Sequence, residues 1–376
     1  MIKSKKLLAI GVIGALGLAA CGSDDDTGSS TSDAPDATDA PDATDAPEGT
    51  TAPEGSTAPD GTGAPVEGDC AVGVVYDITG RGDKSFNDAA GAGLDQAVAD
   101  LGVTPAESTP TGDGDRAERL QGLVDDGNGL VVGVGFLFFD AVTAAAESNP
   151  DTTFAIVDSV VEAPNVASLV FAEEQGSFLV GAAAALKSQT GTVGFIGGVE
   201  NDLIKKFEAG YKAGVAAVDP DIEVLTNYLT QPPDFTGFND PAKGKETAAA
   251  QYEAGADVIY AAAGGSGTGV FEAATEAGEP GEVWAIGVDS DQYELVSADL
   301  QPYILTSMLK KVDVATYNTI EGFCAGEDVS GTQVFDLSVD GVGYSTSGGF
   351  VDDIADQLDA FKEQIVSGEI EVPTAP

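Results

Sequence analysis

The chain has 376 residues, of which 63 are acidic and 16 are basic, so its formal net charge at pH 7 is −47. A chain this acidic repels nucleic acid and anionic lipid, which argues against both as partners. It contains no histidine, which excludes histidine-dependent catalytic triads, histidine metal sites and imidazole general bases.

The N-terminus has the pattern of a secretory signal. Three lysines precede an apolar stretch at 7–20, which is shorter than the about 20 residues that a membrane-spanning helix needs. Cys21 follows directly after small residues, as in the bacterial lipobox. We therefore expect a lipoprotein signal peptide at 1–20 and a diacylated Cys21; the alternative is an ordinary signal peptide with an incidental cysteine.

The segment at 21–69 is acidic and rich in proline, alanine and threonine, and it contains no basic and no aromatic residue. Such a composition buries too little apolar surface to offset the entropy of the chain. We expect a disordered tether, kept extended by proline and charge repulsion, that holds an extracytoplasmic domain to the cell membrane through the lipid.

Two further cysteines, Cys70 and Cys324, remain after Cys21 is lipidated. An even pair in an exported, oxidising setting predicts a disulfide between them. The alternative is two buried free thiols.

Residues 70–376 alternate between apolar runs typical of strands and segments with helical spacing. The expected strands lie at 71–76, 130–134, 154–157, 167–171, 193–196, 223–228, 258–262, 283–288 and 304–307, and the expected helices at 85–101, 141–147, 176–187, 202–217, 242–254 and 269–277. This alternation predicts parallel sheets with helices on both faces. There are too many strands for one compact sheet, so we expect two α/β lobes with a ligand at the carboxyl ends of the strands.

A glycine-rich loop at 264–269 follows the strand expected at 258–262 and begins a helix. One interpretation is a dinucleotide or phosphate loop, but no Lys-Ser/Thr pair completes it. We interpret the loop as a tight turn whose backbone, at Gly264, contacts an uncharged ligand.

Serine and aspartate pairs elsewhere lack a base to activate a nucleophile, so we expect no catalytic residue. Asp113, Asp115 and Glu118 resemble part of a calcium loop, but the EF-hand spacing is absent and we interpret them as a solvated acidic turn. We therefore expect no metal, and we also expect no cofactor.

The end of the first strand and the start of the first helix place three side chains together. Asp77, Phe86 and Asn87 would gather at one carboxyl end, with Ser85 as the helix N-cap. A carboxylate and an amide read both donor and acceptor edges of a heterocycle, and a ring stacks on its face. The alternative is that Phe86 belongs to the core and that Asn87 is a cap.

Asp77 together with the Asp-Lys-Ser-Phe-Asn segment at 83–87 resembles the opening motif of the basic membrane protein family, the purine nucleoside receptor lipoproteins of ABC importers. The similarity continues over nearly the whole exported domain. Further segments fall in family order, at 133–136, 154–158, 176–181, 194–198, 240–245, 264–265, 287–292 and 306–310.

The resemblance implies a type I periplasmic-binding fold, with two doubly wound α/β lobes joined by a three-crossing hinge. The first lobe would comprise 70–172 and 290–330, and the second 173–289 and 331–376. The implied function is capture of a purine nucleoside by a monomer that docks on an ABC permease and its ATPase, without chemistry. The alternatives are a binder of a sugar or another small polar solute, and a surface nucleosidase.

The resemblance also implies how the base is held. Phe86 would stack on one face of the purine and Phe238 on the other, although Phe235 lies in the same loop and competes for that role. The base edges would be bonded by three polar side chains, Asp77, Asn87 and Asp158.

The ribose would be held by a carboxylate and a lysine. Asp289 would accept two ribose hydroxyls, and charge-assisted hydrogen bonds of this kind are strong. Lys310 would reach the same sugar or orient Asp289; the alternative is a surface lysine beside Lys311. At the base, Asp140 competes with Asp158.

Overall fold

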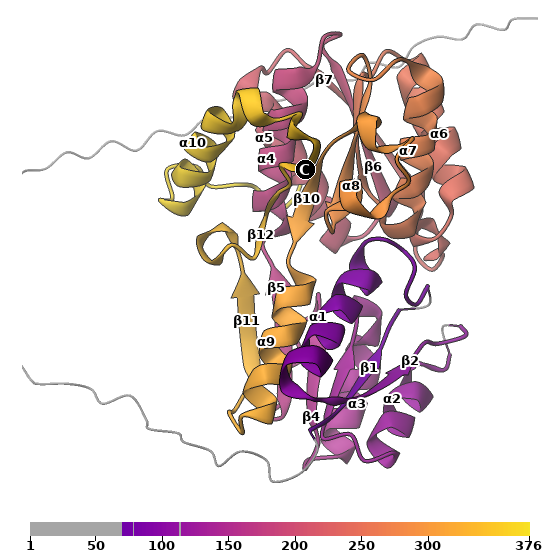
Figure 1. Ribbon diagram of the computed structural model, residues 1–376, viewed down its shortest axis with the longest axis vertical. Helices are drawn as coiled ribbons and strands as arrows, with labels where there is room; N and C mark the ends of the chain where they lie inside the picture. The colour runs from indigo at the N-terminus through magenta and orange to yellow at the C-terminus, as the bar shows by residue number, and fades with distance from the viewer. Residues whose placement is uncertain (1–69, 78, 113) are drawn as a thin grey trace, which may run out of the picture. The chain divides into compact units, whose positions relative to one another are not determined.

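The structure is a computed structural model that describes residues 70–77, 79–112 and 114–376 (Figure 1). The expected signal peptide at 1–20, the lipidated Cys21 and the tether at 21–69 lie outside the described residues. Among the residues that are described, no helix combines the length and the apolar character that a membrane span requires.

The first lobe is built on a six-stranded sheet in which every strand pair is parallel. Its order is β11-β5-β4-β3-β1-β2, and the strands are β1 (Ala71–Val75), β2 (Thr104–Ser108), β3 (Leu130–Gly133), β4 (Thr153–Val157), β5 (Val166–Phe171) and β11 (Gly331–Phe335). Side chains alternate across a strand, so Val74 is buried under one helical layer and Val75 under the other. Those layers are α1 (Phe86–Leu101) with α9 (Val312–Cys324), and α2 (Arg116–Asp125) with α3 (Phe139–Ser148).

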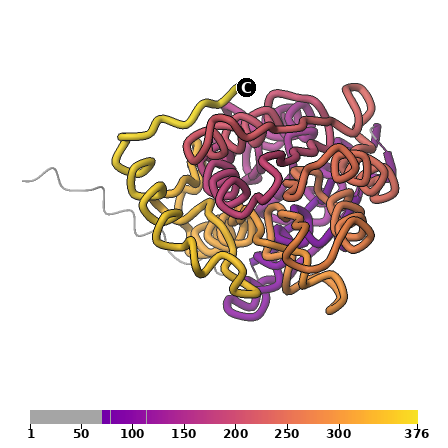
Figure 2. Tube along the Cα trace, turned by 90° about the horizontal axis from the view of Figure 1, so that it is seen from above, coloured from indigo at the N-terminus to yellow at the C-terminus, as the bar shows by residue number. Residues whose placement is uncertain are grey.

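The second lobe repeats this plan around another six-stranded sheet, ordered β12-β10-β9-β8-β6-β7. Only the edge strand β12 is antiparallel to its neighbour; the strands are β6 (Thr192–Val199), β7 (Glu223–Thr230), β8 (Val258–Ala262), β9 (Trp284–Asp289), β10 (Ile304–Lys310) and β12 (Val342–Tyr344). One face carries α4 (Glu173–Lys187), α5 (Asp202–Val218) and α10 (Ala355–Val366), and the other carries α6 (Pro241–Glu253), α7 (Gly267–Ala277) and the short α8 (Gln292–Leu295). Figures 1 and 2 show α10, in yellow, on the side of this lobe opposite α6 and α7.

The chain passes between the two sheets three times, after β5, after β10 and after β11. The three-crossing hinge is therefore present, but two expected boundaries are wrong. The segment at 290–330 was expected in the first lobe, yet β10 pairs with β9 of the second sheet. The segment at 331–376 was expected in the second lobe, yet its first part forms β11, which pairs with β5 of the first. A strand belongs to the sheet that contains the strand it is hydrogen-bonded to, and an apolar run in the sequence does not indicate which strand that is.

Several elements have no counterpart among the expected ones. Strand β2 lies at the edge of its sheet and its side chains are largely exposed, so it carries no apolar run that the sequence would reveal. The other helices and strands missed are α2, the short α8, α9, β11, β12 and α10. The elements that were expected, such as the helix at 85–101, agree with the structure to within a few residues.

Cys70 and Cys324 form a disulfide with an S–S distance of 1.96 Å. The bond joins the residue before β1 to the last residue of α9. Helix α9 is the element by which the chain re-enters the first lobe after its excursion through the second. The disulfide therefore anchors a returning segment to the strand at which the lobe begins.

Candidate functional site

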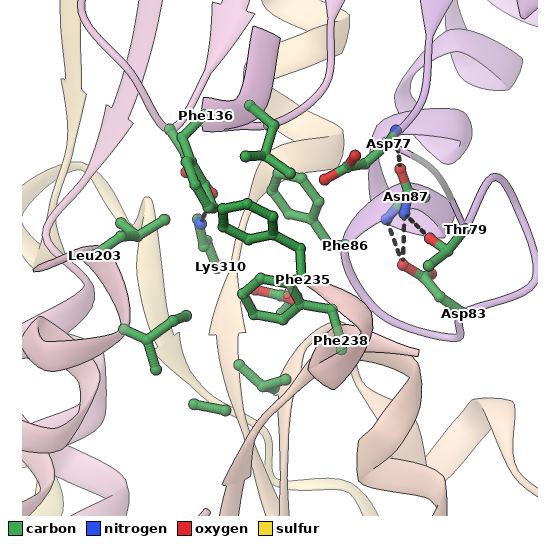
Figure 3. A pocket seen from close by; sticks show the side chains of 18 of the residues that line it. Asp77, Thr79, Asp83, Phe86, Asn87, Phe136, Leu203, Phe235, Phe238 and Lys310 are labelled. Atoms are coloured by element: carbon green, nitrogen blue, oxygen red, sulfur yellow. Dashed lines mark hydrogen bonds and ion pairs between the residues drawn. The ribbon is translucent and has the colours of Figure 1, made fainter. Parts of the chain in front are cut away.

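A pocket lies where the carboxyl ends of the strands in both sheets face each other (Figure 3). Its empty space of about 730 Å³ includes some that is open to solvent. All eight residues predicted to hold a ligand line it: Asp77, Phe86, Asn87, Asp158, Phe238, Gly264, Asp289 and Lys310. Sequence positions as far apart as β1 and β10 meet here because parallel strands present their carboxyl ends on one edge.

Five phenylalanines line this pocket, together with aliphatic side chains such as Leu203. Phe86 and Phe136 come from the first lobe, whereas the second lobe contributes Phe207 of α5 and, from one loop, Phe235 and Phe238. The centres of the Phe136 and Phe235 rings are 6.1 Å apart, with their planes at 63°. Both lobes thus bring aromatic rings to a space where a flat apolar ligand would be covered from both sides.

Three of these lining residues bear on the expected choices. Phe235 and Phe238 both line the pocket, so the structure does not remove Phe235 as a competitor. Phe136 was not assigned to the site, although it stands just beyond the end of β3, which is the signal that could have found it. Gly264 has φ +54°, and a Cβ there would lie 3.2 Å from the Phe238 carbonyl oxygen, so the glycine permits a close turn beside that ring.

Asp77 follows β1, and side chains of α1 and α2 contact it. The Arg116 Nη2 atom lies 3.1 Å from its Oδ1 atom, and Arg116 is itself buried. The backbone N–H of Asp77 donates to the Asn87 side-chain oxygen at 2.9 Å. These contacts position the Asp77 carboxylate where it lines the pocket.

Asn87 has fewer free hydrogen-bonding positions than expected. Its amide nitrogen donates to the Thr79 hydroxyl at 2.6 Å and to the Asp83 carboxylate at 3.0 Å. Both amide hydrogens are therefore used inside the protein. In this structure only the oxygen, which already accepts from Asp77, has a lone pair left for a ligand.

The expected N-cap of α1 is also corrected. Ser85 occupies that position, but its side chain makes no capping hydrogen bond. The Asp83 carboxylate accepts instead, from the N–H groups of Ser85, Asn87 and Asp88 at 2.9–3.1 Å. Burial raises the pKa of Asp83, and these N–H donors oppose the rise because they favour the charged form.

Lys310 ends β10 and is only 2% exposed, so the alternative of a surface lysine is wrong. Its Nζ atom is 2.5 Å from Asp158 Oδ2 and 3.6 Å from Glu173 Oε1. No hydrogen bond to Asp289 is found, so Lys310 joins the two lobes through Asp158 rather than orienting Asp289 directly. Burial opposes the charge of the lysine, but the nearby carboxylates outweigh it and raise its pKa.

Asp158 follows β4 and differs from its competitor Asp140 in where it lies. Asp140 is exposed on α3, whereas Asp158 lines the pocket. The Oδ1 atom of Asp158 is buried without a hydrogen-bond partner among the described residues. A buried unpaired carboxylate oxygen is unfavourable, so this atom is suited to accept a hydrogen bond from a ligand.

Asp289 ends β9 and accepts a hydrogen bond from the Ser85 hydroxyl at 2.6 Å. Burial raises its pKa to about 6, and Lys310 and Ser85 oppose the rise. Both Asp289 and Asp158 have left-handed backbones, with φ 64° and 63°. Such conformations are unfavourable for residues other than glycine and concentrate at functional sites.

Comparison with known proteins places the chain among transporters. A family model described as "ABC transporter substrate-binding protein PnrA-like" matches residues 71–375. The ABC transporter nucleoside-binding protein BmpA of Lactococcus lactis subsp. cremoris is 35% identical over 326 residues, which cover 82% of this chain and 90% of that protein. Basic membrane protein D of Borreliella burgdorferi is 33% identical over 267 residues, or 69% of this chain and 74% of that one.

A solved structure agrees with these matches. The crystal structure of an ABC transporter system solute-binding protein from Aeropyrum pernix K1 has a TM-score of 0.71 and 29% identity, covering 81% of this chain and 93% of that chain. The two α/β lobes with a pocket between them are the type I fold of periplasmic solute-binding proteins.

The fold and the inter-lobe pocket define a substrate-binding component of an ABC transporter, which takes a small molecule outside the cytoplasm and works with a permease. The chain belongs to the Bmp family of PnrA-like ABC transporter substrate-binding proteins, and the resemblance found in the sequence is confirmed. Solute-binding proteins are in general not enzymes.

Proposed function

We propose that this protein captures a purine nucleoside in the inter-lobe pocket and delivers it, unchanged, to an ABC permease. The observation that carries the proposal is a pocket in which phenylalanine rings from both lobes stand beside buried carboxylates. The rings suit the two faces of a base, and the carboxylates suit the donors of a base edge and a ribose. In this proposal Phe86 and Phe238 stack on the base, Asp77 and Asp158 bond its edge, and Asp289 holds the ribose.

The remaining parts of the proposal concern the whole chain. Cys21 would carry the lipid that holds a monomer to the cell membrane, with the segment at 21–69 as a spacer. The ligand would bind, the lobes would close, and the closed form would dock on the permease and its ATPase. Closure needs only a ligand that binds the closed state better than the open one.

The donors and acceptors that line the pocket indicate which purine base binds more tightly. Asp77 and Asp158 are acceptors, and Asn87 has already used both of its amide hydrogens. At N1 of the Watson–Crick edge, guanine and hypoxanthine present an N–H donor, whereas adenine presents an acceptor and keeps only its N6 amino group as a donor on that edge. We expect guanosine and inosine to bind about tenfold more tightly than adenosine, since a buried acceptor without a donor loses about 1–3 kcal/mol.

Calorimetric titration of the full chain with guanosine, inosine and adenosine measures this order. Ribose and arabinose serve as controls for a sugar binder. A thermal-shift assay gives a second readout, since ligand at 100 times Kd stabilises the folded state by about 2.7 kcal/mol. Tighter binding of adenosine would contradict the expected order, and binding of a sugar without any nucleoside would contradict the proposal. Release of free base on incubation would show a nucleosidase.

The affinity for a nucleoside is expected to fall on acidification through pH 6. Burial raises the pKa of Asp289 to about 6; Lys310 and Ser85 oppose this rise, and the nearby Asp158 and Asp83 add to it. The charged form of Asp289 is the better acceptor for ribose hydroxyls. Ligand binding therefore favours loss of this proton, so affinity is full above pH 6 and about tenfold lower at about pH 5. Titrations at several pH values check this, and a flat or rising affinity on acidification would contradict it.

Two points keep the pH experiment interpretable. Burial also raises the pKa of Glu173, to about 7, so Glu173→Gln is the control: the fall in affinity should persist in that variant.

The free energy of unfolding has the opposite pH dependence, because Asp289 binds its proton more tightly in the folded state, with a pKa of about 6, than at its ordinary pKa of 3.8. Its contribution to stability therefore increases, rather than decreases, as the pH falls from 6 towards 4.

A further inference from the structure

Hydrogen bonds join the loop that precedes α1 in the first lobe to the second lobe. The Ser85 hydroxyl donates to the Asp289 carboxylate at 2.6 Å and also lies 3.1 Å from a second acceptor, the Val288 carbonyl oxygen. The Ser290 hydroxyl donates to the Ser85 carbonyl oxygen at 3.0 Å, and the Gln292 amide donates to the Lys84 carbonyl oxygen at 2.9 Å. These contacts join residues more than 200 positions apart, and we call them the inter-lobe latch.

The latch groups on each side are held by hydrogen bonds within their own lobe. In the first lobe, the Asp88 carboxylate accepts from the N–H groups of Gly82 and Lys84 at 2.7 and 2.8 Å, which shapes the loop around Lys84 with its positive φ of 55°. In the second lobe, the Gln292 side-chain oxygen accepts from the Val288 N–H at 2.9 Å. The groups that cross between the lobes therefore approach each other in a set geometry.

Burial makes the latch sensitive to the loss of one partner. Ser85 and Gln292 are both 0% exposed, and Asp289 is 7% exposed. A hydrogen bond to a charged group is stronger than one between neutral groups, and a buried group that loses its partner is unfavourable. Separation of the lobes at this point would leave the Asp289 carboxylate without the Ser85 donor until water replaces it.

We propose that Ser85 is a positioning residue that holds the Asp289 carboxylate in its ligand-accepting orientation only when the lobes are closed. Ser85 does not line the ligand pocket, so it acts through Asp289. The consequence is that closure completes the ribose acceptor, and the ligand in turn favours the closed state in which its acceptor is complete. The role assigned to Asp289 rests on the proposed function, whereas the existence of the latch does not.

Ser85→Ala in the full chain tests the proposal with ligand. Guanosine should dissociate about tenfold faster from the variant, as measured by stopped-flow displacement. The acid midpoint of the affinity should also move above that of the unmodified protein, because Ser85 favours the charged form of Asp289. A loss of packing alone would not move this midpoint. Unchanged dissociation together with an unchanged midpoint would overturn the positioning role.

Two control variants separate the latch from the loss of any buried hydroxyl. Ser290→Ala removes a latch bond that does not touch Asp289, so dissociation should quicken less and the midpoint should stay. Ser177→Ala removes a buried hydroxyl that lies 3.4 Å from the Tyr260 hydroxyl and takes no part in the latch, and should change neither. If Ser85→Ala does not fold, Ser290→Ala provides the test. The latch would be overturned if this variant changed neither the rate of guanosine dissociation nor the amide exchange at 84–88 and 288–292.

Hydrogen exchange of the ligand-free protein tests the latch without any nucleoside. Amides of 84–88 and 288–292 should exchange several-fold faster in Ser85→Ala than in the unmodified protein, while the core strands of both lobes keep their rates. Equal exchange would overturn the latch whatever the ligand. If the exchange changes as expected but the unmodified protein binds no nucleoside, the proposed function fails and the latch stands.

Discussion

Replacing Phe86 with alanine is expected to weaken nucleoside binding by about 5- to 150-fold. The ring lies in the pocket at the start of α1, and stacking of a base on an aromatic side chain contributes about 1–3 kcal/mol. Phe238→Ala should have an effect of similar size if Phe238 provides the second face. The double variant should then show no measurable nucleoside binding by calorimetry.

Two further variants give this experiment its controls. Phe235→Ala tests the competing ring in the same loop; a larger loss there than in Phe238→Ala would reassign the second face. Phe361→Ala removes a ring that packs against Phe178 in the second lobe, outside the pocket, and should leave affinity unchanged. Nucleoside binding that survives in both Phe86→Ala and Phe238→Ala would contradict the stacking model.

Replacing Lys310 with methionine is expected to destabilise the protein by about 3–5 kcal/mol, with a fall in melting temperature on the order of 10 °C. The lysine is buried, and its Nζ atom lies 2.5 Å from the Asp158 carboxylate and 3.6 Å from the Glu173 carboxylate. The centres of the Phe86 and Phe171 rings lie 5.0 and 5.1 Å from the same atom. Without the cation these buried carboxylates repel each other and lose a donor. Urea unfolding of the full chain measures the change.

A second substitution tests whether the effect arises from the charge. Asp158→Asn added to Lys310→Met should recover part of the lost stability, since it removes one of the uncompensated charges. Lys206 also contacts Glu173, at 3.2 Å, but it is 35% exposed, so Lys206→Met should have a much smaller effect. Equal stability of Lys310→Met and the unmodified protein would contradict this account of the cluster.

The sequence predicted which residues line the pocket better than it predicted the lobes. Asp77, Phe86, Asp158 and Asp289 each stand at or just after the end of a recognisable strand or at the start of a helix, and position in such an element determines which edge of a parallel sheet a residue reaches. Apolar periodicity reports burial and element type, so it located most strands and helices of both cores but missed α2, α9 and α10. It does not report which strands pair, and the segments that form β10 and β11 were therefore assigned to the wrong lobes.

The sequence alone also settled the absence of histidine chemistry, the acidic charge and the family to which the motifs belong. Only the tertiary structure decided the partners of the polar groups. Lys310 bonds Asp158 across 152 positions, and Ser85 donates to Asp289 across 204 instead of capping its helix. The physical reason is that a hydrogen bond depends on atoms within about 3 Å, and the packing of two separate sheets brings such atoms together without leaving a local pattern in the chain.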